Sequence, residues 1–324
     1  MLTRRTLIKW GMASAALATL GTTATASTTI ASTTGMAATS SSASRSRLIL
    51  LGTAGGPTPK ANRAAPSQAI VVDGHTYLID AGNGVARQLV KAGIDLNSLE
   101  SVFLTHHHSD HNADLGNAIF LAWSGPLNHV VDIYAPPPAK QMMEDFTSLN
   151  RVDIDIRVED EGRAPFSEMY RVHEHSEPGV VMEDERVKVT SALVQHPPVT
   201  PSFAFRFDTP DRSIVISGDT APTPALIELA KGADVLVHEV MHVPSLEQLV
   251  STEPQADRLM EHLKASHTSV AQVGSIAEQA GVKTLVLSHF VPGGYPFIED
   301  DVWRQAAQQG FSGEVIVGRD LMEI

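Results

Sequence analysis

The stretch Thr105-His106-His107-His108-Ser109-Asp110-His111 places four histidines and one aspartate within seven residues. It follows directly on Ser101-Val102-Phe103-Leu104, an apolar run that predicts a strand. Imidazole and carboxylate groups together suit divalent metals such as zinc. An artificial histidine tag would stand at a terminus and would lack the interleaved aspartate, and a histidine-rich surface loop gives no reason for this pattern. The stretch therefore predicts a metal site.

The spacing within this stretch divides its ligands between two ions. In extended backbone His106 and His108 point to the same side, so they can share one ion. Asp110 and His111 stand at the start of the following helix and are expected to turn toward a second ion. The side chain of His107 points to the opposite side of the extended backbone. We therefore expect it to face solvent or to support a ligand rather than to bind metal.

The composition is that of a globular protein. The chain has 324 residues, of which 43% are hydrophobic and 19% charged, enough for one large domain or two small ones. The 24 Lys and Arg residues are outnumbered by 37 Asp and Glu, and the resulting formal charge of −13 counts against nucleic acid as a partner. Cysteine is absent, which excludes disulfides, zinc–thiolate sites and a cysteine nucleophile.

Residues 1–44 are expected to be a targeting segment followed by a low-complexity linker. Arg4 and Arg5 precede a mildly apolar stretch and then Ser/Thr/Ala-rich sequence, a pattern similar to a twin-arginine export signal. The apolar stretch is shorter than the roughly 20 residues that a membrane span requires, so no stable membrane anchor is expected. We therefore expect a periplasmic or secreted protein whose hydrolase domain comprises residues 45–324.

Histidine or aspartate recurs where predicted strands end. The residues concerned are His106 with His108, His196, Asp219, His238 and His289. Loops at the carboxyl ends of strands commonly build sites at the rim of a sheet. One such residue would mean little, but the recurrence predicts that these side chains converge on one rim.

Residues 151–186 differ in character from the rest. Between Asp153 and Glu185 there are eleven acidic residues and only three arginines. We expect an excursion over the surface, serving as an arm or a lid. His173 and His175 fall within it and are left out of the site, because exposed histidines in acidic loops are common.

The combined motifs resemble those of the metallo-β-lactamase superfamily over roughly residues 48–324. They are the H-x-H-x-D-H of residues 106–111, a distant histidine, Gly218-Asp219-Thr220 and the late Ser288-His289. The resemblance implies an α/β fold, the αβ/βα sandwich of two mixed sheets flanked by helices, with a two-metal site. Val237-His238-Glu239 and His267-Thr268-Ser269 are most similar to the ribonuclease Z-like and arylsulfatase-like branch.

The resemblance also implies ligands for two zinc ions, with other divalent metals as alternatives. One ion would be held by His106, His108 and His196, the other by Asp110, His111 and His289, and Asp219 would bridge both. A hydroxide between the ions would attack the substrate. Asp110 would orient this nucleophile, and His267 with Glu239 would assist protonation of the leaving group. For His267 and Glu239, a purely structural hydrogen-bonded pair is the alternative.

These inferences predict an exported dinuclear zinc hydrolase of small anionic esters, with aryl sulfates as the favoured substrates. The alternative is a phosphodiesterase of the ribonuclease Z-like branch, followed by a lactonase or β-lactamase. A non-catalytic metal-binding protein is a further alternative, although all seven ligands are present. The expected partner is a small anionic molecule and not nucleic acid, because of the acidic charge, the export signal and the acidic segment 151–186. The oligomeric state stays open, with a homodimer as one option.

Overall fold

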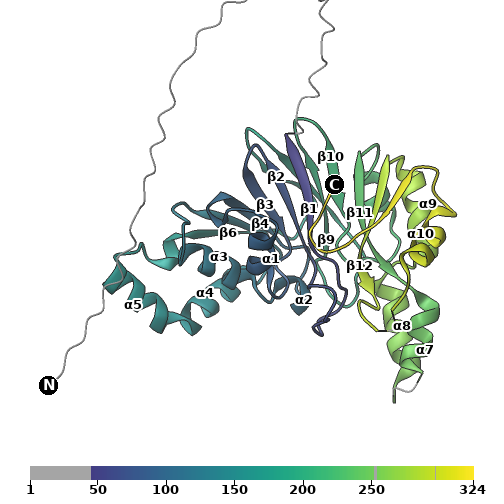
Figure 1. The fold of residues 1–324 in the computed structure, drawn as a ribbon, viewed down its shortest axis with the longest axis horizontal. Coiled ribbons are helices and arrows are strands. Elements are labelled where there is room, and N and C mark those ends of the chain that lie inside the picture. Colours follow the sequence, from purple (N-terminus) through teal and green to yellow (C-terminus); the bar gives the residue numbers. More distant parts are fainter. Residues whose placement is uncertain (1–44, 252–253, 296) are drawn as a thin grey trace, which may run out of the picture. The chain divides into compact units, whose positions relative to one another are not determined.

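A computed structural model describes residues 45–251, 254–295 and 297–324. Residues 1–44, on which the predicted export signal lies, are outside the described residues. The described chain forms two seven-stranded sheets that pack face to face, with helices against both outer faces (Figure 1). The αβ/βα sandwich predicted from the sequence is therefore confirmed.

The first sheet comes mainly from the amino-terminal half of the chain. Its strand order is β14-β1-β2-β3-β4-β5-β6, antiparallel from β14 to β3 and parallel from β3 to β6. Strands β2 and β3 are joined by a tight hairpin turn, with positive φ angles of 49° at Asp73 and 86° at Gly74. The strands are β1 (Ser46–Gly52), β2 (Ser67–Val72), β3 (His75–Ile79), β4 (Leu99–Phe103), β5 (Val131–Ala135), β6 (Tyr170–Glu174) and β14 (Met322–Glu323).

The second sheet is built from the carboxyl-terminal half. Its order is β13-β12-β11-β10-β9-β8-β7, parallel from β10 to β13 and antiparallel from β7 to β10. The strands are β7 (Gly179–Glu183), β8 (Lys188–Leu193), β9 (Phe203–Asp208), β10 (Ser213–Ile216), β11 (Val235–Met241), β12 (Thr284–Val291) and β13 (Glu314–Val317).

Alternation along the strands explains why both faces of each sheet are apolar. In β1, Leu48 and Leu50 belong to the core between the sheets, whereas Ile49 and Leu51 belong to the core under the helices. Successive side chains of a strand point to opposite faces, so a strand covered on both sides is a nearly continuous apolar run. This burial holds the ends of the strands, and the loops that follow them, in fixed positions.

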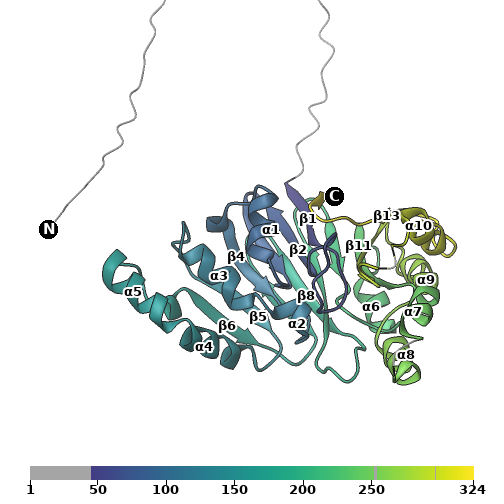
Figure 2. The same ribbon diagram turned by 60° about the horizontal axis from the view of Figure 1, so that its bottom comes forward.

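Helices cover the two outer faces. Their bounds are α1 (Val85–Lys91), α3 (Leu115–Trp123) and α4 (Ala139–Leu149) on the first sheet, and α6 (Pro224–Leu229), α9 (Val270–Ala280) and α10 (Asp300–Gln308) on the second (Figure 2). Helix α9 begins at a capping box that Ser269 forms with Gln272.

The remaining helices lie closer to the rim or the periphery. They are α2 (Ser109–Asn112), α5 (Arg151–Glu161), α7 (Val243–Val250) and α8 (Ala256–Ser266), with short 3₁₀ turns at Leu96–Ser98 and Phe166–Glu168. Within the described ranges, none of the helices combines the length and apolar character that crossing a membrane requires.

The acidic segment 151–186 is more regular than the surface excursion expected from the sequence. It contains α5 and then β6 and β7, which form the edges of the first and second sheets, respectively. An edge strand has one neighbour and tolerates charged side chains, so an acidic composition is compatible with strand pairing. His173 in β6 contacts Asp132 through Nε2 at 2.7 Å, and the His175 ring lies 4.4 Å from that of Phe203.

Candidate metal centre

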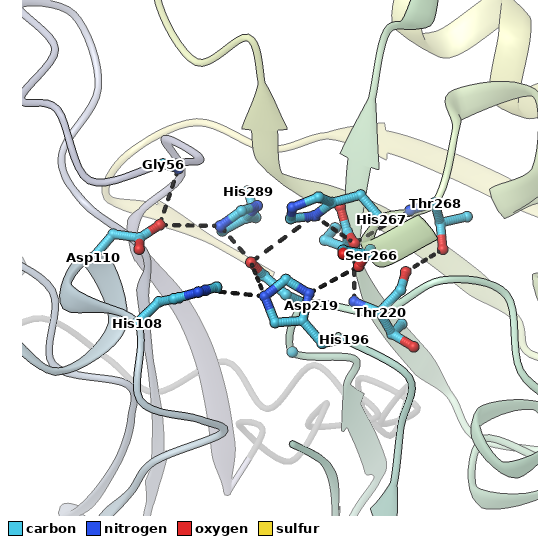
Figure 3. Close-up of polar contacts among 12 residues, drawn as sticks. Gly56, His108, Asp110, His196, Asp219, Thr220, Ser266, His267, Thr268 and His289 are labelled. Carbon is cyan, nitrogen blue, oxygen red and sulfur yellow. Dashed lines mark hydrogen bonds and ion pairs between the residues drawn. The ribbon is translucent and has the colours of Figure 1, made fainter. Parts of the chain in front are cut away.

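The predicted ligands come together at the ends of strands from both sheets (Figure 3). His106 and His108 follow β4, His196 follows β8 and Asp219 follows β10, while His289 lies near the end of β12. Loops that follow buried strands can carry polar side chains to a shared rim without disturbing the core.

A first cluster of donor atoms is built from three imidazoles. Nδ1 of His108 lies 3.1 Å from Nε2 of His106 and 3.0 Å from Nε2 of His196. Oδ2 of Asp219 is 3.9 Å from Nε2 of His106 and 3.8 Å from Nε2 of His196. These four donor atoms lie within 4.8 Å of one another, as ligands around one ion would.

A second cluster lies directly beside the first. Nε2 of His111 is 3.2 Å from Nε2 of His289 and 3.6 Å from Oδ2 of Asp110, and His289 is 3.4 Å from the same oxygen. Oδ1 of Asp219 lies 3.4 Å from Nε2 of His111 and 3.2 Å from Nε2 of His289. The two oxygens of Asp219 therefore face different clusters.

The donor set fits divalent cations. Asp219 is 2% exposed, and its Oδ1 accepts no hydrogen bond of good geometry from the described residues, although the Nε2 atoms of His111 and His289 lie 3.4 and 3.2 Å away. A buried carboxylate oxygen without a hydrogen bond is costly unless a cation compensates for its charge. Five imidazoles and two carboxylates, with no thiolate, form a set that suits borderline divalent metals.

Neutral groups orient two of the imidazoles in the first cluster. Nδ1 of His106 contacts Oγ1 of Thr105 at 3.0 Å, and Nδ1 of His196 donates to the carbonyl oxygen of Ser266 at 2.8 Å. Both rings thus present Nε2 to the cluster. Burial lowers the pKa of His106 well below its ordinary value, so this ring is neutral and keeps the lone pair that a metal ligand needs.

A buried carboxylate supports the second cluster. Nδ1 of His111 donates to Oδ2 of Asp80 at 2.7 Å, and Oδ1 of Asp80 accepts the backbone N–H of Thr105 at 2.8 Å. Burial lowers the pKa of His111, but Asp219 and Asp80 outweigh it and leave the pKa well above its ordinary value. Asp80 was not predicted from the sequence. The sequence feature that could have identified it is an aspartate directly after the apolar strand β3. In the structure Asp80 has a positive φ of 58°, which aspartate tolerates better than most residues.

Asp110 is held in place from the loop after β1. Its Oδ2 accepts the backbone N–H of Gly56 at 2.9 Å, and it is 5% exposed (Figure 3). Burial would raise the pKa of Asp110, but His289 and His111 hold the pKa below its ordinary value. The carboxylate is therefore ionised at neutral pH.

His267 and Glu239 lie at the side of the first cluster. Nδ1 of His267 donates to Oε1 of Glu239 at 3.0 Å and lies 3.9 Å from Oδ2 of Asp219. Oε1 of Glu239 also accepts the backbone N–H groups of Thr220 and Thr268, at 2.9 and 3.2 Å. Burial alone would lower the pKa of His267, but Glu239 outweighs it and raises the pKa to about 9.

Two other histidines stay outside both clusters. His107 turns away, and its Nε2 donates to the carbonyl oxygen of Pro136 at 2.7 Å. His238 is fully buried in β11 with Nδ1 against the carbonyl oxygen of Glu239, so the expectation that it joins the rim is wrong. Because side chains alternate along a strand, only one of the neighbours His238 and Glu239 can face the site.

A cavity of about 260 Å³ opens onto the two clusters. Its walls include the ligands His108, Asp110, Asp219 and His289 on one side and residues of α8 on another. A substrate in this cavity would have direct access to donor atoms from both clusters.

Comparisons with known proteins identify the family. Residues 75–290 match the family model described as the Beta-lactamase superfamily domain. Ribonuclease Z of Mycobacterium sp. strain KMS is 36% identical over 279 residues, which cover 86% of this chain and 95% of that protein. Ribonuclease Z of Mycobacterium avium strain 104 is 35% identical over 280 residues, covering 86% of this chain and 97% of that protein.

Solved structures share the fold. The metallo-β-lactamase fold protein YhfI from Bacillus subtilis has a TM-score of 0.65 at 21% identity, covering 86% of this chain and 99% of that chain. The short form of human tRNase Z has a TM-score of 0.62 at 22% identity, covering 86% and 98%, respectively.

These relatives overturn two expectations from the sequence. The favoured arylsulfatase function is wrong, because relatives that match along nearly their whole length are named ribonuclease Z, which supports the phosphodiesterase alternative. The expectation of a small anionic partner and no nucleic acid is wrong for the same reason, since these relatives are named for action on RNA. The acidic net charge was a poor guide because it averages over the whole surface. The chain is a metal-dependent hydrolase, and it belongs to the metallo-β-lactamase superfamily, in the ribonuclease Z-like branch.

Proposed function

We propose that this protein hydrolyses phosphodiester bonds, with RNA as the substrate class that its relatives indicate, at a centre of two zinc ions. The observation that carries the proposal is Asp219, whose two oxygens face two separate clusters of donor atoms at the mouth of one cavity. Adjacent pairs of divalent ions recur in enzymes that cleave phosphate esters.

The proposed ligands divide into two sets that share one residue. His106, His108 and His196 would hold one ion, Asp110, His111 and His289 the other, and Asp219 would contact both. Zinc is proposed because the set combines imidazole with carboxylate, although other divalent metals use similar ligands. When bound, the ions would supply Lewis acidity toward the phosphoryl oxygens and make water acidic enough to react at neutral pH.

The protein's own groups would handle the protons. Hydrolysis adds water to phosphorus and breaks the bond to the leaving oxygen, so one proton leaves the water and one must reach the leaving oxygen. Ionised Asp110 lines the cavity and would orient the water by accepting a hydrogen bond from it. His267, with its pKa raised to about 9, is protonated at neutral pH and is placed to donate the proton that the leaving oxygen needs, while Glu239 fixes its orientation.

Purified protein would test this function directly. Its turnover would be measured on a bis-aryl phosphodiester, a short RNA, an aryl sulfate and a lactone, before and after chelator treatment, with metal content determined in parallel. We expect phosphodiester hydrolysis that is lost with chelator and restored by zinc. Protein that carries two ions per chain but cleaves neither diester would rule out the proposal.

His267→Ala should separate proton donation from metal binding. We expect kcat on RNA to fall by roughly 10²- to 10⁴-fold, since a positioned general acid is lost. Activity on a diester with a nitrophenolate leaving group should fall much less, because this leaving group needs no proton. Metal content should be unchanged. Equal losses on both substrates would point to a structural role for His267 and Glu239.

We also propose that residues 1–44 direct export by the twin-arginine route, on the basis of Arg4, Arg5 and the weakly apolar stretch that follows. Fractionation of cells that express the full chain, or a variant with lysine at both positions, would test this. We expect the unchanged chain outside the cytoplasm, with a new amino terminus between residues 27 and 46. Retention of both proteins in the cytoplasm would contradict export.

A further inference from the structure

Helix α8 forms a wall of the cavity that opens onto the two donor clusters. Leu259, His262 and Leu263 of this helix line the cavity, opposite the proposed ligands. Their spacing of three and four residues places them on one face of the helix. This face is therefore where the chain would meet whatever group is attached to a phosphate held at the clusters.

Helix α8 is also fixed by packing against α7, in a small cluster that Leu263 of the cavity wall joins. Met260, 8% exposed, packs with Leu246 and Val250 of α7 and with Met241 in a small hydrophobic cluster. Figures 1 and 2 show α7 and α8 lying side by side. Because this cluster holds the helix, the exposed side chains of Leu259 and His262 are left available to contact a ligand.

Two of the three cavity-facing side chains, Leu259 and His262, are exposed. Leu259 is 38% exposed, although leucine is usually buried. His262 is exposed, and its ring makes no hydrogen bond or ion pair with the described part of the chain. An apolar surface beside an uncommitted imidazole offers packing for a flat ring and a hydrogen bond for its edge.

The charge of the lining residues and the volume of the cavity limit which chemical groups can bind there. Among the described residues that line the cavity there is no lysine or arginine, so the wall offers no cation to a second phosphate. The volume of about 260 Å³ lies below the roughly 300–1,000 Å³ of pockets for drug-sized ligands. The cavity therefore suits a single uncharged ring system and is too small for a base pair.

We propose that this cavity receives one unpaired nucleobase next to the scissile phosphate, with Leu259 and Leu263 against its face and His262 at its edge. The inference rests on the proposed phosphodiesterase function and adds the residues that select its substrate. Stacking on an apolar or aromatic side chain is tolerant of base identity, so the cavity would select for an unpaired base more than for a particular sequence.

Three diesters with the same p-nitrophenolate leaving group would test the proposal. The other ester group would be thymidine, phenyl or methyl, so kcat/KM compares a nucleobase, a simple ring and no ring. Leu259→Ala should lower kcat/KM for the thymidine diester by about 5- to 10-fold, the effect of a lost apolar contact. It should leave the methyl diester within about twofold.

The matched control is Leu249→Ala on α7. Leu249 is 41% exposed, close to the 38% of Leu259, but it does not line the cavity. This variant should keep the preference of the unchanged protein for the thymidine diester.

The role of His262 needs its own variants. His262→Ala should lower kcat/KM for the thymidine diester but not for the phenyl diester. His262→Gln, which keeps a hydrogen-bonding group, should restore part of the lost kcat/KM. Metal content and the thermal midpoint should match across all variants.

Binding gives a readout that does not depend on turnover. Calorimetry should show tighter binding of thymidine 5′-phosphate than of methyl phosphate, with the difference lost in Leu259→Ala and kept in Leu249→Ala. If this holds but no diester is cleaved, the phosphodiesterase proposal fails while the nucleobase cavity stands. Equal binding of the two phosphates, a uniform effect of Leu259→Ala on all three diesters, or a preference for phenyl over thymidine would overturn the cavity's assignment.

Discussion

The two donor clusters of the metal centre differ in charge, although they lie side by side and share Asp219. The first contains three imidazoles, and Asp219 supplies its only carboxylate. The outer nitrogens of two of these rings, His106 and His196, contact neutral groups, the hydroxyl of Thr105 and the carbonyl of Ser266. The second contains Asp110 as well as Asp219, and the outer nitrogen of His111 donates to the carboxylate of Asp80.

This difference indicates that the two ions would be held unequally. A carboxylate partner makes an imidazole a better donor, and each carboxylate ligand adds attraction for a cation in a buried site. We therefore expect the second cluster to bind its ion more tightly and the first to lose its ion sooner during dialysis against chelator. Substitutions in the shared residue and in the outer partners can test this ranking.

Asp219→Ala should have the largest effect, because among the described residues Asp219 is the one whose two donor atoms face both clusters. We expect metal content to fall to one ion or none per chain, with an ion remaining, if at all, in the second cluster. Activity should fall by more than about 100-fold, beyond the loss that follows removal of an outer partner alone. Elemental analysis of the purified variant and kcat/KM on a diester would measure both. Two retained ions and full activity would refute the shared role of Asp219.

Asp80→Asn should have a smaller effect that falls mainly on the second cluster. Asparagine fits the same space and tolerates the positive φ of 58°, but it removes the negative charge beside His111. We expect a 10- to 100-fold loss of affinity for the more tightly bound ion. Competition with a chromogenic chelator would resolve the two affinities.

Thr105→Val is the matched change at the first cluster. It removes the hydroxyl partner of His106 at nearly constant volume, and because that partner is neutral, we expect less than about a 10-fold loss at the weaker site. Since the same hydroxyl also contacts Asp80, a modest change at the second site would be compatible with the comparison. If Thr105→Val weakened binding more than Asp80→Asn, the ranking of the clusters by charge would be wrong.

Sequence reasoning reached the proposed ligands because their residue types and their positions after strands are local features. His106, His108, Asp110 and His111 stand in one stretch, and His196, Asp219 and His289 follow or end apolar runs. The partners of the ligands were harder to predict. Asp80 supports His111 across 31 positions of the chain, and this pairing exists only once β3 and β4 lie in register.

The fold was also predictable from local features of the sequence, and each wrong prediction has a physical cause. Strands buried on both faces, such as β1 and β12, stand out as apolar runs. The edge strands β6 and β7 are half-exposed and lie in the acidic segment 151–186, so their sequence predicts a surface excursion instead. His238 was assigned to the rim by position alone, although the alternation with Glu239 excludes it. The substrate class was misjudged because the acidic charge, the export signal and the acidic segment 151–186 do not describe the site itself.

His107→Ala should have the smallest effect and gives the sharpest contrast within one stretch. His107 donates to the carbonyl oxygen of Pro136 and lies 3.2 Å from Nδ2 of Asn112 through Nδ1, so it joins neither cluster. We expect unchanged metal content and a loss of about 1 kcal/mol in the free energy of unfolding, the usual value of one hydrogen bond. His108→Ala, one residue along, should instead empty the weaker first cluster and leave the second ion in place. If His107→Ala released an ion, His107 would be a metal ligand, and the two clusters as assigned would be incomplete.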